Sequence, residues 1–375
     1  MNYANDDYYR MYPNCFTVMG YNRSIIIDTN TRKIKYIGNN HFELINKLKE
    51  KPICDVTKLD TEALSLVNYL IENNFGQILK EEQLDNFIEI DDDVTVPFSS
   101  NSIIDINTIN INVLNNTINK LSEAKIANIQ FRFLKDVKHQ AFNQLIDLLE
   151  TFSFYSIELL FSYPFYTSLP QDIKRSLENN LMIKKIFVFD AKKENVKHTS
   201  KFLFLKSPLN EYNLCGHTSV KYFSVFLETV INSKKYNSCL NCKISVDIDG
   251  HVKNCPSMKE SYGNINEVSL IEILNNESFQ KFNKITKDNI DVCKDCEFRY
   301  VCSDCRAYTD NPDNIYSRPS KCNYNPYISK WKGEEGYQTL EECGVITDEK
   351  EYSRDDEKIA AINKELWEEE EAENA

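Results

Sequence analysis

Glycine is scarce in this sequence, with nine in 375 residues, and none of them lies between Gly76 and Gly216. A loop that brings its backbone against a phosphate or a nucleotide needs glycine for positive φ angles and for close approach. The 139 residues of 77–215 therefore contain neither a dinucleotide-binding G-x-G-x-x-G motif nor a P-loop.

Long apolar runs and an excess of positive charge are missing as well. No apolar run approaches the roughly 18 residues of a membrane-spanning helix. The first residues, MNYANDDYYRMYPN, are too polar and acidic for a secretory signal. The formal net charge of −13 leaves no basic stripe of the kind that binds nucleic acid. The composition therefore predicts a cytoplasmic protein without a membrane or nucleic-acid partner.

Cysteine, in contrast, is abundant and concentrated. All twelve cysteines except Cys15 and Cys54 lie within residues 207–345. In a reducing compartment, clustered cysteines indicate a metal centre more often than disulfides. Each C-x2-C pair can place two thiolates on one metal centre without backbone strain. Eight cysteines suit two [4Fe–4S] clusters or two zinc ions, and their spacing leaves both open: Cys239, Cys242, Cys255, Cys293, Cys296, Cys302, Cys305 and Cys322.

Residues 1–95 are predicted to form a winged-helix-like α+β module. The stretches CFTVMG, RSIIID and KIKYIG alternate like strands, and the turn TNTR joins the last two. Helical periodicity follows in 40–51 and 60–74, and FGQILK closes the module as a strand. With nine Lys/Arg against ten Asp/Glu in residues 14–88, the module lacks the charge that DNA binding needs. Its hairpin, expected to turn one face to the helices, can instead accept an extended peptide as an added strand.

Residues 96–206 contain a repeat that predicts parallel strands connected by helices. Strand-like runs are centred on Ile104, Phe131, Leu159 and Phe187, at spacings of 27, 28 and 28 residues. Helical patterns lie between them, which indicates βαβ units and a parallel sheet. Four such units are too few to close an eight-stranded barrel. We therefore expect an α/β fold whose centre is a partial (β/α) barrel or an open parallel sheet.

The cysteine motifs of residues 239–327 resemble a SPASM domain, the auxiliary iron–sulfur module of many radical-SAM peptide-modifying enzymes. The resemblance rests on NSCLNCKISVDIDGHVKNCPSM, CKDCEFRYVCSDCRAY and RPSKCNYNPY. More narrowly, these motifs are similar to those of the SPASM-domain peptide maturases of grasp-with-spasm systems. The resemblance implies a cysteine-rich SPASM domain in residues 207–345. The acidic residues 346–375 that follow are predicted to form a helical tail.

The resemblance also implies how the cysteines divide between two [4Fe–4S] clusters. The first cluster would take Cys239, Cys242, Cys255 and Cys305, and Cys215 of LCGHTS is an alternative to Cys242. The second cluster would take Cys293, Cys296, Cys302 and Cys322. Beyond these metal ligands, no cofactor-binding or catalytic residue is indicated.

One motif of the radical-SAM enzymes is missing from the central segment. Their C-x3-C-x2-C motif follows the first barrel strand, but the corresponding stretch NTININVLNN contains no cysteine. The resemblance therefore implies an accessory protein of peptide maturation that binds a precursor peptide and acts with an ATP-grasp ligase. Two alternatives stay open. One is a redox enzyme or radical-SAM-type maturase that uses its two auxiliary clusters, and the other is a scaffold stapled by zinc.

Overall fold

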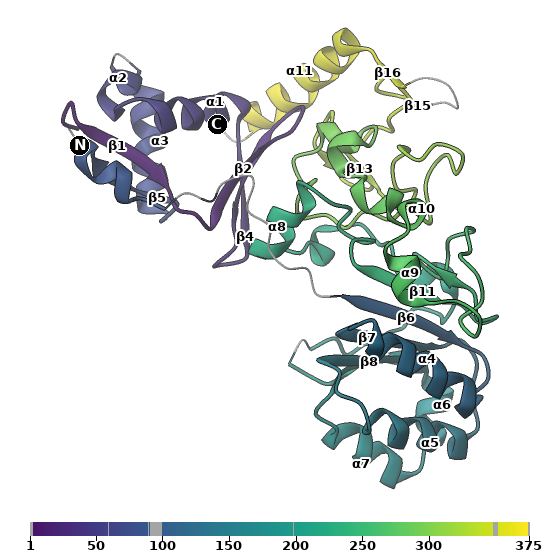
Figure 1. Cartoon of the computed structure of the whole chain (residues 1–375). Helices are drawn as coiled ribbons and strands as arrows, with labels where there is room; N and C mark the ends of the chain where they lie inside the picture. The colour runs from purple at the N-terminus through teal and green to yellow at the C-terminus, as the bar shows by residue number, and fades with distance from the viewer. Residues whose placement is uncertain are drawn as a thin grey trace.

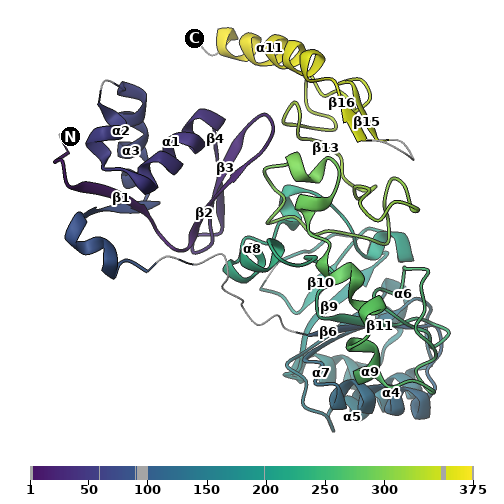
Figure 2. The ribbon, with the colours of Figure 1, turned by 45° about the horizontal axis from the view of Figure 1, so that its top comes forward.

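The computed structural model describes residues 3–58, 60–88, 90, 100–197, 199–347 and 352–373. It has three parts: an N-terminal module, a central sheet with helices, and a cysteine-rich segment that lies between them (Figure 1, Figure 2). None of the helices in these ranges is long and apolar enough to cross a membrane. The predicted boundary between residues 95 and 96 lies outside the described residues.

The N-terminal module combines two small antiparallel sheets with three helices. One sheet has the strand order β2-β3-β4, and the other pairs β1 with β5. The predicted strands and both predicted helices are confirmed, while β1 and α2 are additional elements. In chain order the elements are β1 (Asp7–Met11), β2 (Cys15–Met19), β3 (Ser24–Asp28), β4 (Lys33–Ile37), α1 (Asn39–Glu50), α2 (Ile53–Thr57), α3 (Thr61–Glu72) and β5 (Gly76–Lys80).

The central strand of this module, β3, is buried on both faces. Ile26 packs with Ile45 of α1, so one face of the sheet meets the helices as expected. The opposite face is not open to solvent, because Ile25 and Ile27 pack with Phe298 and other residues of the cysteine-rich segment. All five residues of β3 are therefore buried. The N-terminal module and the cysteine-rich segment share one hydrophobic core.

The central sheet has seven strands in the order β10-β9-β8-β7-β6-β11-β12. Every neighbouring pair is parallel except β11 and β12, which form an antiparallel hairpin. The predicted α/β fold with an open, mostly parallel sheet is thus confirmed. The strands are β6 (Asn101–Ile106), β7 (Asn128–Phe133), β8 (Ser156–Ser162), β9 (Ile183–Phe189), β10 (Phe202–Phe204), β11 (Lys243–Val246) and β12 (Val252–Lys253). The helices are α4 (Ile111–Glu123), α5 (His139–Leu149), α6 (Tyr163–Ser168) and α7 (Gln171–Asn179).

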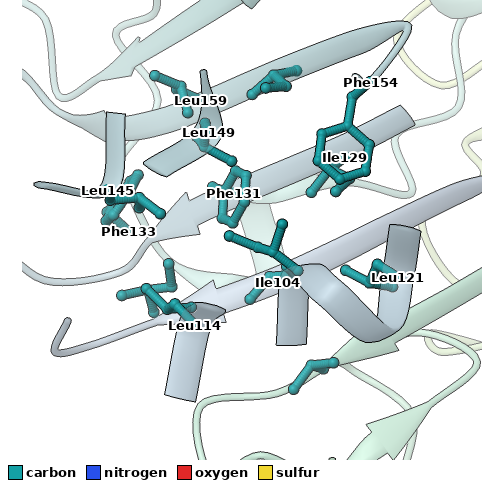
Figure 3. Packing of buried hydrophobic residues seen from close by; sticks show 14 of the residues in the cluster. Ile104, Leu114, Leu121, Ile129, Phe131, Phe133, Leu145, Leu149, Phe154 and Leu159 are labelled. Carbon is teal, nitrogen blue, oxygen red and sulfur yellow. The ribbon is translucent and has the colours of Figure 1, made fainter. Parts of the chain in front are cut away.

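The main hydrophobic core lies between this sheet and its helices. Figure 3 shows Ile104, Phe131 and Leu159 of three neighbouring strands packed with leucines of α4 and α5. Because successive side chains of a strand point to opposite faces, Asp105 and Arg132 lie on the face away from these helices. The hairpin of β11 and β12 was predicted, but its pairing with β6 was not. That pairing joins the cysteine-rich segment to the central sheet.

The cysteine-rich segment itself has only short regular elements, and the acidic tail packs on it. Ile359 of α11 is 0% exposed and packs with Tyr327 and Cys343. Asn363 Nδ2 also donates to the carbonyl oxygen of Tyr327 at 2.7 Å. Of the tail predicted as helical over residues 346–375, the part that forms a helix is α11, whose apolar side is docked, and two short paired strands precede it. The elements are α8 (Leu227–Ser233), α9 (Leu270–Leu274), α10 (Glu277–Gln280), β13 (Tyr324–Asn325), β14 (Lys330–Trp331), β15 (Val345–Thr347), β16 (Tyr352–Arg354) and α11 (Asp356–Glu373).

Candidate metal centres

Four cysteines that we call site A come together beside the hairpin of β11 and β12. The thiol of Cys215 is hydrogen-bonded with that of Cys255 and interacts electrostatically with Cys239 and Cys305. Cys239 precedes β11 and Cys255 follows β12, so the hairpin returns both to one end of the sheet. Site A thus consists of Cys215, Cys239, Cys255 and Cys305.

One thiol of site A, that of Cys255, lies in an environment that favours the thiolate, the form that binds metal. The pKa of Cys215 is raised by its hydrogen bond with Cys255, and burial raises the pKa of Cys305. The hydrogen bond from Cys215 lowers the pKa of Cys255 to about 6, and Lys243 and Arg132 act in the same direction. The ammonium group of Lys243 lies 3.3 Å from Cys239 Sγ. Site A therefore has buried positive charge that stabilises several negative sulfurs.

Gly216 forms part of the wall of site A. Its φ angle is +79°, a region that glycine adopts without strain. A Cβ atom at this position would lie only 3.2 Å from Cys305 Sγ. The missing side chain therefore leaves room beside the sulfur.

Cys242 lies apart from site A, although its C-x2-C spacing predicted it as a ligand. Its thiol contacts the Asn241 side chain at 3.7 Å, and burial is the cause that raises its pKa. The φ angle of Cys242 is +54°, and β11 begins at the next residue. The structure brings Cys215, the alternative considered from the sequence, to the other three thiols instead.

Four further cysteines, which we call site B, line one small cavity. They are Cys293, Cys296, Cys302 and Cys322, the set expected for the second cluster. Aromatic side chains complete the wall: Phe223, Phe298, Tyr324 and Trp331. Burial raises the pKa of Cys293 to about 12, while the nearby Lys287 opposes that rise. The thiol of Cys293 therefore needs a positive partner in order to ionise.

The backbone just before site B is strained. Val292 has a φ angle of +67°, which is rare for a β-branched residue. The N–H of Cys293 donates to the carbonyl oxygen of Asp291 at 2.7 Å, so Val292 is the centre of a tight γ-turn. Such strain is concentrated at functional sites, and this turn fixes the direction of Cys293.

The donor chemistry of both sites fits iron–sulfur clusters. Each site offers four cysteines, the usual ligand set of a [4Fe–4S] cluster. A tetrahedral zinc ion with Zn–S bonds of about 2.3 Å would hold its sulfurs about 3.8 Å apart. Among the described residues, no three cysteine sulfurs lie within 4.8 Å of one another. The thiols are therefore not placed as a tetrahedral zinc ion would hold them.

A comparison with protein families agrees with this donor chemistry. Residues 238–297 match the family SPASM, described as an iron-sulfur cluster-binding domain. The chain carries a SPASM domain. The matched range contains cysteines of both sites, namely Cys239 and Cys255 of site A and Cys293 and Cys296 of site B.

Among solved structures, two similar chains are forms of Streptococcus suis SuiB. SuiB bound to S-adenosylmethionine has a TM-score of 0.31 and 8% sequence identity, covering 84% of this chain and 99% of its own. SuiB bound to precursor peptide SuiA has a TM-score of 0.31 and 9% identity, covering 86% and 99%. A TM-score this low supports no argument about fold or function. Among curated proteins, no match was found.

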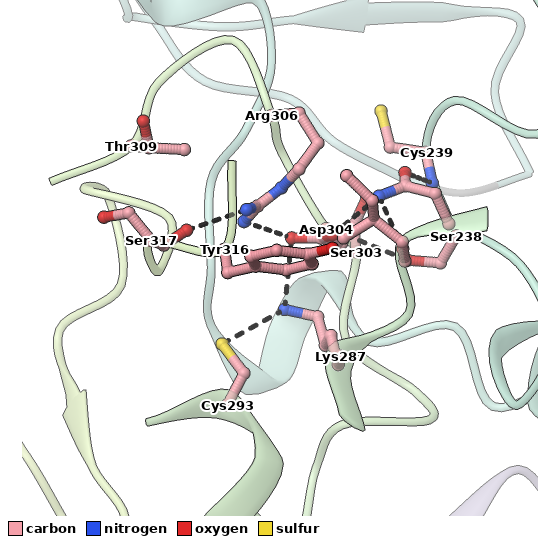
Figure 4. Close-up of polar contacts among 12 residues, drawn as sticks. Ser238, Cys239, Lys287, Cys293, Ser303, Asp304, Arg306, Thr309, Tyr316 and Ser317 are labelled. Atoms are coloured by element: carbon pink, nitrogen blue, oxygen red, sulfur yellow. Dashed lines mark hydrogen bonds and ion pairs between the residues drawn. The ribbon is translucent and has the colours of Figure 1, made fainter. Parts of the chain in front are cut away.

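Site A and site B are connected through Asp304, which is 1% exposed. Lys287 lies between site B and this carboxylate, 3.8 Å from Cys293 Sγ and 3.9 Å from Asp304 Oδ1 (Figure 4). On the other side, Asn237 Nδ2 donates to Asp304 Oδ2 at 2.6 Å. Asn237 Oδ1 in turn accepts from the N–H of Cys239 at 3.0 Å. A continuous polar chain thus runs from site B to site A.

An ion pair holds the N-terminal module against the SPASM domain at site B. Glu297, next to Cys296, accepts from Arg23 Nε at 2.7 Å and from the Tyr324 hydroxyl at 2.5 Å. The N–H of Tyr21 donates to the carbonyl oxygen of Asp295 at 2.7 Å. The module is therefore bound to site B by polar contacts as well as by the shared core.

The sequence analysis missed the charged residues around both sites. Arg132 and Asp105 stand in the otherwise apolar strand patterns IQFRF and SIIDI, and this interruption was a usable signal. Lys243 and Lys287 carry no such signal, because lysine is ordinary in exposed loops and strand ends. Asp304, between Cys302 and Cys305, could have been noticed as a charge inside a metal-binding motif.

Proposed function

We propose that this chain is an iron–sulfur accessory protein of peptide maturation, which binds a precursor peptide and acts with an ATP-grasp ligase. One observation carries the proposal: the N-terminal sheet packs directly on site B, so the proposed peptide-binding edge and the proposed metal centre share one hydrophobic core. The SPASM domain supplies the iron–sulfur part of the proposal. The ligase partner is supported by the resemblance of the cysteine motifs.

The proposed ligands are the four cysteines of each site. Site A would hold one [4Fe–4S] cluster through Cys215, Cys239, Cys255 and Cys305. Site B would hold the other through Cys293, Cys296, Cys302 and Cys322. When bound, such a cluster can transfer single electrons and can also fix the fold of the loops that hold it. The chain's own contribution is to supply the thiolates, to place buried cations beside them and to exclude water.

The proposed peptide site is the outer edge of β4. Among the described strands, β4 pairs only with β3, so its other edge can accept an extended peptide as an added strand. Lys33, Lys35 and Tyr36 are exposed on this strand. The two lysines favour a precursor segment that carries acidic residues.

Aromatic side chains connect the β4 edge with site B. The guanidinium of Arg23 stacks on the Tyr36 ring at 3.9 Å, and the same guanidinium lies 5.9 Å from the Phe298 ring. Phe298 lines the cavity of site B. A peptide bound along β4 would therefore contact residues that are rigidly connected to the metal centre.

A redox enzyme is the second candidate function, and the polar chain through Asp304 favours it. That chain joins the surroundings of the two sites without a gap, which suits electron exchange between two clusters. For either candidate we propose the cytoplasm, because all twelve cysteines are free thiols, as a reducing compartment allows.

Proline substitutions on β4 test the peptide site. Neighbouring N–H groups of a strand point to opposite sides, so one of Lys35 and Tyr36 donates outward. We expect that the proline variant of that residue keeps its thermal midpoint but binds a fluorescently labelled precursor peptide at least about tenfold more weakly, from loss of one hydrogen bond. The other proline variant should lose stability, since its N–H bonds to β3.

The matched controls are Lys35→Ala and Tyr36→Ala, which keep the N–H groups. The titration uses the full-length chain and, as the probe, a short peptide that carries acidic residues, the kind of precursor segment proposed above. If both proline variants bind the peptide as the alanine variants do, β4 is not the docking edge. The recognition role would then belong to another surface.

A further inference from the structure

Arg132 of β7 is a fully buried cation with one uncommitted nitrogen. Its side chain is 0% exposed. Asp105, its direct neighbour on β6, accepts from Nε at 2.5 Å and from Nη2 at 2.7 Å. Nη1 has no hydrogen-bond partner among the described residues. Because a buried guanidinium N–H without an acceptor is unfavourable, we expect an acceptor beside this nitrogen.

Arg132 faces site A. Phe131 and Phe133 point into the core under the helices, so the alternation of the strand directs Arg132 to the other face. Burial alone would lower the pKa of Arg132, but Asp105, and after it the thiols of Cys255 and Cys215, raise it. The thiols that act electrostatically on this guanidinium are therefore those of site A.

We propose that Arg132 Nη1 donates a hydrogen bond to the iron–sulfur cluster of site A and raises the reduction potential of that cluster. This inference rests on the iron–sulfur occupancy proposed above. A cubane held by four thiolates is an anion, and it becomes more negative when it takes up an electron. A fixed cation beside it therefore favours the reduced form. Asp105 acts through Arg132, because its two hydrogen bonds hold the guanidinium in this orientation.

Site B provides an internal reference for this effect. Its buried cation is Lys287, whose ammonium group is shared between Cys293 and Asp304 at 3.8 and 3.9 Å. Arg132 interacts with thiols of site A, and none of the interactions that shift its pKa involves a thiol of site B. Loss of the guanidinium should therefore shift the potential of site A and leave that of site B in place.

A redox titration followed by EPR on the full-length, anaerobically prepared protein tests the proposal. Cys215→Ser and Cys296→Ser identify which signal belongs to which site. Two substitutions of the pair remove the guanidinium: the double variant Asp105→Asn with Arg132→Gln, which keeps the shape of the pair, and an apolar replacement, Asp105→Leu with Arg132→Met, which fills a similar volume. The matched control is Lys185→Gln, which removes a cation from the same face two strands away, where Lys185 Nζ donates to the Ser200 carbonyl at 2.9 Å.

We expect the double variant to lower the equilibrium constant for reduction at site A at least tenfold, which is 59 mV for a one-electron couple. The potential of site B should not change in the double variant. In the Lys185→Gln protein, the potentials of both sites should stay the same. Equal shifts at both sites, or no shift at site A, would overturn the inference. If the double variant fails to retain iron, the apolar replacement decides, because apolar residues of similar volume can replace a buried ion pair without leaving an unpaired charge. An unchanged site A potential in that variant overturns the inference. Absence of iron from the unaltered protein would overturn the proposed function as well.

Discussion

Replacement of Cys215 by serine is expected to remove about half of the iron and sulfide, whereas replacement of Cys242 by serine should leave nearly all of both. The reason is the position of the two thiols. Cys215 is hydrogen-bonded with Cys255 and interacts with Cys239 and Cys305, and Cys242 is buried against Asn241 instead. A cluster that loses one of four thiolates is held weakly, because serine is a poor ligand for iron. Iron and sulfide per chain after anaerobic purification are the quantities to measure.

Cys54→Ser serves as the control, because Cys54 lies in α2 and belongs to neither site. Cys296→Ser should remove the other half of the iron by disrupting site B. The opposite result, iron lost from Cys242→Ser and kept in Cys215→Ser, would contradict the proposed ligand set. It would restore the assignment implied by the cysteine spacing alone.

Replacement of Asp304 by alanine is expected to cost about 3–5 kcal/mol of unfolding free energy, the usual effect of breaking a buried ion pair from one side. Arg306 Nη2 lies 2.7 Å from this carboxylate, and Lys287 lies 3.9 Å from it. Both cations are nearly buried, so the variant leaves their charges without a counterion. It also releases Asn237, which orients the N–H of Cys239. Urea unfolding of the anaerobic protein measures the loss.

Glu260→Gln is the matched control for Asp304. Its ion pair with Lys281 is 2.7 Å long but largely exposed, so its loss should change the free energy of unfolding by at most about 1 kcal/mol. We also expect Asp304→Ala to lower the iron content of both sites, because the polar contacts of Asp304 reach the surroundings of both sites. Equal stability of the two variants would show that Asp304 does not hold the sites together.

Local patterns were sufficient to predict the central strands and helices. The strand centres Ile104, Phe131, Leu159 and Phe187 all lie in parallel strands. Each of these strands is short and largely apolar, and a helix follows each of the first three. The site B cysteines could be predicted from the sequence equally well, since three of them lie within ten residues of one another. Local sequence patterns thus predict both the central strands and the ligands of site B.

Contacts between distant segments could not be predicted in this way. Cys215 reaches site A from a loop that precedes the C-x2-C motif of Cys239, and no local pattern places it there. The second buried face of β3 depends on Phe298, far along the chain, and strand alternation alone does not report it. The pairing of β11 with β6 is a third case, because strand register across such a separation depends on the packed core.

Metal and sulfide analysis of the unaltered full-length protein, purified without oxygen, tests the central claim most directly. Two [4Fe–4S] clusters held by sites A and B predict about eight iron and eight sulfide per chain, with little zinc. Stoichiometric zinc with negligible sulfide would contradict the account and leave a zinc-stapled scaffold in its place.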